Sequence, residues 1–157
     1  MAQSPEYIIL GAGVIGLTTA LELSSRYPES SFRILAKYVP GDKTIEYCSP
    51  WAGANWLSVA RDGGRMEGWD RVTYEKFGKL ADEKGMETGI KKLQIKAWFD
   101  REIEDAGVLS DSGDGKGKIW YEGLTGLRFV EEVKPEGSVF GFECGSFVVD
   151  VQVYLSW

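Results

Sequence analysis

The sequence predicts an α/β fold that begins with a strand–helix–strand unit, and three observations support this prediction. Residues 7–10 form a continuous apolar run, as expected for a strand buried in a parallel sheet. Glycines follow at once, and Val14, Leu17 and Leu21 then recur at helical spacing. A second mostly apolar run at residues 32–36 completes the pattern within about 30 residues, the length of one βαβ unit.

Each boundary of the predicted helix has a local signal. Gly13 directly precedes the helical repeat. Pro28 disfavours helical geometry in the residue before it, so the helix is expected to end at Tyr27. Polar residues 29–31 then separate the helix from the second strand. The two strands should therefore lie parallel, with the helix as their crossover connection.

The second part of the chain predicts one longer helix. Apolar residues recur at helical spacing between positions 74 and 81, with Asp70 or Thr73 as the expected N-cap. Gly85 stands where such a helix would stop. Residues 61–69 are polar and rich in glycine, and we expect them to precede the helix.

The remaining segments predict strands but no further alternation of strand and helix. Residues 93–99 form a strand pattern, residues 140–151 are rich in β-forming residues, and residues 110–118 have the composition of a flexible loop. Residues 153–157 resemble the opening turn of a buried helix. Parallel sheets need several strands with both faces covered. We therefore expect either a truncated fold, whose missing strands lie on further sequence, on a second chain or on a second copy in a homodimer, or an unusual small fold.

The composition excludes several classes of function. The 157 residues carry a net charge of −6 and no basic run, which argues against binding to nucleic acid or to an anionic membrane. No apolar stretch approaches the roughly 20 residues that span a bilayer. Histidine is absent, which excludes Ser-His-Asp and Cys-His pairs and histidine-containing zinc sites. We therefore expect no metal, and a cofactor that carries the difficult chemistry.

The two cysteines, Cys48 and Cys144, lie far apart in the sequence and form no CxxC motif. This usage is typical of a reducing intracellular compartment. We expect both to be free thiols that serve as small apolar residues, and a disulfide between them is the alternative.

Gly11, Gly13 and Gly16 match the G-x-G-x-x-G pattern between the first strand and the helix. In this context the pattern indicates a dinucleotide site. The first glycine allows a tight turn, the second lets a pyrophosphate approach the backbone, and the third lets the helix pack closely on the strand. The helix N-terminus then offers N–H groups and the positive end of its dipole to the phosphates.

The residue after the second strand helps to discriminate between dinucleotides. NAD sites usually place an acidic residue there, but Lys37 occupies the position and no acid follows until Asp42. A lysine could pair with the 2′-phosphate of NADP or be a solvated surface residue. The residues alone therefore predict a dinucleotide other than NAD and leave NADP and FAD open.

A run of small residues between two tryptophans, at positions 49–56, is the second notable segment. Small residues permit close approach to a ring or a phosphate chain, and Trp51 and Trp56 could form the walls of an apolar slot. The alternative interpretation is a compact loop whose tryptophans fill the core.

These two segments together resemble the D-amino-acid oxidase family of FAD enzymes in its fungal form. They are YIILGAGVIGLTTALEL at residues 7–23 and SPWAGANW at residues 49–56, and their spacing also agrees. Weaker resemblance runs along essentially the whole chain. The implied fold is the start of an FAD-binding Rossmann-type domain at residues 1–60, followed at residues 61–157 by part of an interleaved α+β cap or substrate domain.

The resemblance implies FAD as the cofactor and suggests site residues position by position. It places the FAD pyrophosphate against Gly11, Gly13, Val14, Ile15 and Gly16. It places the adenosine ribose near Lys37 and the phosphates near Thr44, with the flavin alongside Gly53, Ala54 and Asn55.

The resemblance also implies a reaction, in which a D-amino acid and oxygen yield an imino acid and hydrogen peroxide, and then a keto acid and ammonia. The family's substrate-binding tyrosine and arginine have no counterpart here, so no catalytic residue is expected. The family is commonly peroxisomal, but no C-terminal peroxisomal signal follows Leu155, so a peroxisomal or a cytoplasmic location is expected. Two alternatives remain open: a non-catalytic truncated nucleotide-binding module, and a fragment of an NADP-dependent dehydrogenase.

Overall fold

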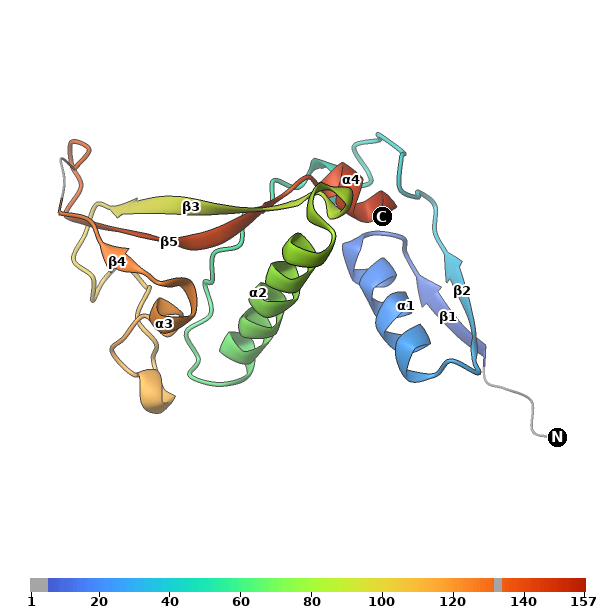
Figure 1. Ribbon diagram of the computed structural model, residues 1–157, viewed down its shortest axis with the longest axis horizontal. Helices are drawn as coiled ribbons and strands as arrows, with labels where there is room; N and C mark the ends of the chain where they lie inside the picture. The colour runs from blue at the N-terminus through green and yellow to red at the C-terminus, as the bar shows by residue number, and fades with distance from the viewer. Residues whose placement is uncertain (1–5, 132–133) are drawn as a thin grey trace. The chain divides into compact units, whose positions relative to one another are not determined.

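The computed structural model describes residues 6–131 and 134–157 (Figure 1). The contacts within the chain group it into two compact units. The first extends to Ala54 and includes Asp150–Trp157, and the second comprises Asn55–Val149.

The first unit contains the strand–helix–strand pattern that the sequence predicts. β1 (Glu6–Leu10) leads into α1 (Val14–Arg26), and β2 (Ser31–Leu35) returns beside β1. The two strands are parallel, with Tyr7 opposite Phe32. Figure 1 shows α1 lying along this small sheet. The prediction of two parallel strands joined by a crossover helix is therefore confirmed.

The sheet of the first unit has one covered face and one open face. On the face toward α1, Ile9 is buried, and the rings of Tyr7 and Phe32 stack with their centroids 5.3 Å apart. On the opposite face the side chain of Leu10 is 80% exposed and that of Leu35 is 48% exposed. Parallel sheets normally have both faces covered, so the described residues leave one apolar face of this sheet open.

Two short helical segments complete the first unit. Ser49–Trp51 forms a 3₁₀ helix, and α4 (Val151–Ser156) follows later in the chain. The carboxylate of Asp150 accepts two backbone N–H bonds from the first turn of α4, at 3.1 and 3.3 Å. The helical turn predicted at residues 153–157 is therefore present, although Trp157 is 53% exposed rather than buried.

The second unit has an antiparallel sheet. Its helices are α2 (Arg65–Glu83) and α3 (Glu122–Thr125), and its strands are β3 (Ile90–Phe99), β4 (Arg128–Phe129) and β5 (Phe140–Val149). The strand order is β3-β5-β4, with both pairs antiparallel. Two further 3₁₀ helices are Gly85–Thr88 and Gly113–Gly115. The two strands predicted in this part of the chain are confirmed, and the α/β class holds as a mixed α/β fold with small sheets.

Aromatic side chains form the core of the second unit. Trp56 is only 7% exposed, and its ring centroid lies 4.6 Å from that of Tyr74 and 5.8 Å from that of Tyr121. Tyr74, on α2, also contacts Phe147, on β5, at 4.9 Å. Burial raises the pKa of Tyr121, so its hydroxyl stays protonated at neutral pH. Such aromatic pairs contribute about 0.5–1.5 kcal/mol each beyond their buried area, and here they hold α2 against the sheet.

The start of α2 differs from the prediction. The segment expected to precede the helix forms its first turn, and neither Asp70 nor Thr73 is the N-cap. The carboxylate of Asp62 accepts the N–H groups of Met66 at 3.0 Å and of Glu67 at 3.2 Å. These bonds satisfy donors that the first turn cannot satisfy itself, so the helix begins earlier than its apolar repeat.

The two cysteines have different surroundings. Both are free thiols, as predicted. Cys144 is fully buried on β5, and burial raises the pKa of its thiol. Cys48, by contrast, is exposed.

We expect Asp62→Asn to lower the stability of the chain at neutral pH. Bonding to the N–H of Met66 holds the pKa of Asp62 below its ordinary value of 3.8. Its contribution is therefore complete above that value and is lost as the pH falls through the lowered pKa of the folded state. Urea unfolding should show a lower midpoint for the variant at about pH 7, and the two midpoints should converge as the pH falls below the lowered pKa of Asp62.

The matched control for this prediction is Glu75→Gln, which removes a carboxylate from an exposed position of the same helix. It should leave the midpoint nearly unchanged. A difference between Asp62→Asn and the wild type that does not change with pH contradicts a stabilising role for the negative charge of Asp62, because asparagine keeps an oxygen that can accept the same N–H groups.

Candidate functional site

The turn after β1 joins the first strand, the helix and the second strand. Gly11 has a φ of +95°, a conformation that glycine adopts freely and other residues rarely adopt. Its N–H donates to the carbonyl of Leu35, the last residue of β2, at 2.8 Å. The tight turn expected at Gly11 is therefore present, and it is bonded to the carboxyl end of the neighbouring strand.

Gly16 allows α1 to pack against this turn. A Cβ atom at Gly16 would lie 2.0 Å from the carbonyl oxygen of Gly11 and 3.5 Å from Cγ2 of Ile9. The first distance is far inside van der Waals contact, so no side chain fits at this position. The structure thus shows the close packing of helix on strand that the sequence predicts for the third glycine.

Gly13 faces a hydroxyl group of this chain. A Cβ atom there would lie 2.8 Å from Oγ of Ser49, which also accepts the N–H of Val14 at 3.2 Å. Beside it, the hydroxyl of Tyr47 donates to the carbonyl of Ala12 at 2.6 Å. The closeness of Ser49 is therefore a reason for glycine at position 13 that does not depend on a pyrophosphate. Ser49 and Tyr47 lie at the site, and the sequence pattern contains no signal that reveals them.

The first turn of α1 offers two N–H donors. The N–H of Leu17 donates to the carbonyl of Gly13 at 3.0 Å and so makes the first bond of the helix. Within the described part of the chain, the N–H groups of Ile15 and Gly16 have no acceptor. Free donors at the positive end of a helix dipole suit phosphate oxygens. The residues present therefore fit the pyrophosphate of a dinucleotide.

Lys37 is engaged by an acidic neighbour. Its Nζ lies 2.5 Å from Oε2 of Glu46 and 4.9 Å from the ring centroid of Tyr38, whose hydroxyl also donates to Glu46. Glu46 raises the pKa of Lys37, and Lys37 lowers the pKa of Glu46. Because this ammonium already has a partner, it attracts a 2′-phosphate less than a free lysine would.

The other predicted site residues lie further along the chain. Thr44 and Ala54 are half-buried, and Gly53 is exposed. Asn55 belongs to the second unit, where it forms an isolated antiparallel bridge with Val148. The structure therefore brings together five of the predicted residues in what we call the glycine turn: Gly11, Gly13, Val14, Ile15 and Gly16. The positions of Gly53, Ala54 and Asn55 along a flavin stay a prediction. The positions of Thr44 near the phosphates and of Lys37 near the ribose also stay predictions.

The two tryptophans of the 49–56 segment have different surroundings. Trp56 lies in the core of the second unit, so the interpretation in which a tryptophan fills the core is confirmed for it. Trp51 belongs to the first unit and is 55% exposed, with its Nε1 donating to the carbonyl of Thr44 at 3.0 Å.

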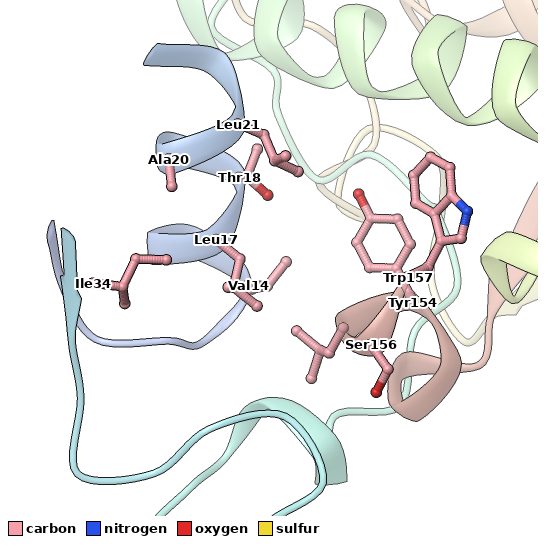
Figure 2. A pocket seen from close by; sticks show the side chains of 10 residues that line it. Val14, Leu17, Thr18, Ala20, Leu21, Ile34, Tyr154, Ser156 and Trp157 are labelled. Carbon is pink, nitrogen blue, oxygen red and sulfur yellow. The ribbon is translucent and has the colours of Figure 1, made fainter. Parts of the chain in front are cut away.

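An apolar pocket of about 280 Å³ lies between α1 and α4 within the first unit. Figure 2 shows Val14 and Leu17 of α1 facing Tyr154 of α4 and Trp157, the residue after α4, across it. The side chain of Val14 lines this pocket, whereas its N–H bonds to Ser49. The pocket is therefore lined by side chains of α1, whereas the contacts of the glycine turn involve the backbone at the start of α1.

Other parts of the described chain give few indications of a second site. A more open cavity of about 500 Å³ lies in the second unit, between α2 and the strands β3 and β5, and no predicted site residue lines it. Residues 6–131 and 134–157 contain no group of three or more His, Cys, Asp or Glu side chains that could hold a metal ion. No helix in these ranges is long and apolar enough to cross a membrane.

We expect Gly16→Ala to destabilise the chain strongly. The added methyl group would meet the backbone of Gly11, so α1 must move away from the strand. Overpacking of this kind costs about 1–3 kcal/mol or more, measured by urea unfolding followed by circular dichroism. The control is Gly53→Ala, where a Cβ atom meets nothing within 4 Å and the change should be below about 0.5 kcal/mol. Equal effects of the two substitutions would contradict the close packing at Gly16.

The chain is similar to known fungal proteins over nearly its whole length. No family model matches the chain. The chain is 31% identical over 153 residues to a D-amino-acid oxidase of Schizosaccharomyces pombe, an alignment that covers 97% of this chain and 41% of the yeast protein. It is 30% identical over 162 residues to a D-amino-acid oxidase of Fusarium vanettenii, covering 99% of this chain and 43% of that protein.

A third relative carries a related name. A D-aspartate oxidase of Cryptococcus neoformans is 38% identical over 94 residues, covering 54% of this chain and 24% of that protein. The chain thus spans less than half the length of the curated relatives that it matches. It is a homologue of the fungal proteins named D-amino-acid oxidase and D-aspartate oxidase, and the similarity extends along nearly its whole sequence.

Proposed function

We propose that this chain holds the ADP part of FAD and that the complete protein is an FAD-dependent oxidase of D-amino acids. The observation that carries the proposal is the glycine turn, where two free N–H donors at the start of α1 meet the carboxyl ends of two parallel strands. Ligands bind at this edge in open α/β sheets. Similarity to D-amino-acid oxidases supports FAD as the dinucleotide.

The backbone of the glycine turn would hold the pyrophosphate. Gly11 keeps the turn tight, and Ile15 and Gly16 present N–H groups to phosphate oxygens. When bound, FAD supplies the redox chemistry, by which a D-amino acid becomes an imino acid while oxygen is reduced to hydrogen peroxide. Water then converts the imino acid to a keto acid and ammonia. The role of this chain is to bind and orient the cofactor.

We assign different roles to two parts of the chain. Residues 1–60 form the cofactor part, and residues 61–157 form part of a cap or substrate domain. We assign no catalytic residue, because no side chain matches the family's substrate-binding tyrosine and arginine. A peroxisomal location is likewise part of the proposal, through the family resemblance.

An NADP-dependent dehydrogenase is a weaker candidate. It depended on Lys37 as a partner for a 2′-phosphate, and that ammonium is paired with Glu46. FAD needs no such partner, so the ion pair favours FAD over NADP.

We expect the purified chain to retain FAD and to produce no peroxide. The chain is mixed with excess FAD, freed of unbound cofactor by gel filtration, and examined for visible flavin absorbance. Peroxide release from D-alanine is assayed in the same sample. Absorbance without peroxide is the expected result, because the glycine turn is present and no catalytic residue is assigned.

The other outcomes of this experiment are equally informative. Peroxide release would contradict the assignment of no catalytic residue and exclude a non-catalytic module. Absence of flavin, with NADPH bound instead, would overturn the proposed cofactor.

A second prediction tests the position of the pyrophosphate. We expect Ile15→Glu to weaken FAD binding about tenfold or more, because a carboxylate at the start of α1 repels the phosphates. The side chain of Ile15 is 81% exposed, so the substitution should leave the fold intact. Thr19→Glu adds the same charge one turn further along α1 at an exposed position and should have a much smaller effect. Titration calorimetry at low ionic strength gives both affinities, and equal weakening by the two variants would argue against a phosphate at this turn.

A further inference from the structure

The side chains of Tyr47 and Ser49 form hydrogen bonds with the backbone of the glycine turn on either side of Gly13. The hydroxyl of Tyr47 donates to the carbonyl of Ala12 at 2.6 Å, and Oγ of Ser49 accepts the N–H of Val14 at 3.2 Å. Each bond joins residues 35 positions apart in the sequence. The turn is therefore held from outside as well as by its own backbone.

Both side chains are fixed in place. Tyr47 is only 7% exposed, and burial raises the pKa of its hydroxyl, which therefore remains a donor at neutral pH. Ser49 opens a 3₁₀ helix whose next residue, Pro50, is buried. Gly13 has no Cβ to keep Ser49 away, since such an atom would lie 2.8 Å from its Oγ.

The two bonds determine which donors of α1 are free and where they point. Ser49 takes the N–H of Val14, and the next two N–H groups, of Ile15 and Gly16, have no acceptor within the described residues. The bond from Tyr47 holds the peptide plane of Ala12, just before the helix begins. A shift of this turn would redirect the free donors, because they belong to the same short stretch of backbone.

We propose that Tyr47 and Ser49 are positioning residues that preorganise the glycine turn for the pyrophosphate of the cofactor. This inference rests on the proposed function, since it concerns the same site. Neither side chain needs to touch the phosphates, because each acts through the backbone of the turn. Preorganisation lowers the cost of binding, so the removal of either hydroxyl should weaken nucleotide affinity even where the chain stays folded.

The test measures binding of ADP and of FAD to the full chain by titration calorimetry at 25 °C. Ser49→Ala and Tyr47→Phe should each weaken both ligands by about two- to tenfold, the net worth of one hydrogen bond. The factor should be the same for ADP and FAD, because the turn lies on the ADP side. Ser49→Thr, which keeps the hydroxyl, should restore the wild-type affinity.

Two controls separate positioning from general stability. Ser24→Ala removes a hydroxyl that donates to the carbonyl of Leu21 within α1 at 2.9 Å. Tyr27→Phe removes the hydroxyl of an exposed tyrosine in the same unit. Both should bind ADP with wild-type affinity. Amide hydrogen exchange of Val14, faster in Ser49→Ala than in the wild type, gives a second readout that needs no ligand.

The outcomes distinguish the inference from the function on which it rests. A wild-type chain that binds neither ADP nor FAD overturns both. Wild-type binding with unchanged affinity in Ser49→Ala and Tyr47→Phe overturns the positioning role alone, and so does a lowered melting temperature without any change in affinity. Weakening that Ser49→Thr fails to restore also overturns the role assigned to the Ser49 hydroxyl.

Discussion

The close approach of α1 to the turn after β1 is the contact on which the first unit depends. Gly16 has no space for a side chain beside the carbonyl of Gly11, and the N–H of Gly11 is bonded to Leu35 at the end of β2. These contacts bring the start of the helix and the carboxyl ends of both strands to one place. The free N–H donors of α1 lie there as a consequence of the packing, so the same contacts also position the donors that we propose bind the pyrophosphate.

The two units contribute unequally to the proposed function. All the contacts that we assign to the pyrophosphate lie in the first unit, which has a parallel sheet with one open face. The second unit has an antiparallel sheet and an aromatic core around Trp56 and Tyr121, and its described residues include none of the glycine turn. Similarity to the fungal proteins named D-amino-acid oxidase nevertheless covers both units.

Much of the fold could be predicted because its signals are local. The strand–helix–strand unit follows from apolar periodicity and from glycines at fixed positions, and the end of α2 is marked by Gly85, whose φ is +55°. The start of α2 was not predictable in the same way. Its N-cap position is Gly64, and the first-turn N–H groups of Met66 and Glu67 donate to the carboxylate of Asp62, which lies outside the apolar repeat. The start of a helix cannot be predicted from apolar periodicity when it depends on a side chain outside the helix.

The sequence by itself determined the local geometry of the turn, because the G-x-G-x-x-G spacing between a strand and a helix places glycine where the backbone has a positive φ, at Gly11, and where a Cβ atom would not fit, at Gly16. From this spacing it also predicted the class of site. Only the tertiary structure decided which other side chains serve that turn. Tyr47 and Ser49 reach it from 35 positions away, and Glu46 takes the ammonium of Lys37. Trp56, although it belongs to the small-residue segment, fills the core of the second unit. Motif spacing reports on residues that are close in the sequence. The contacts of Tyr47, Ser49, Glu46 and Trp56 involve residues that are not close in the sequence, which only folding brings together.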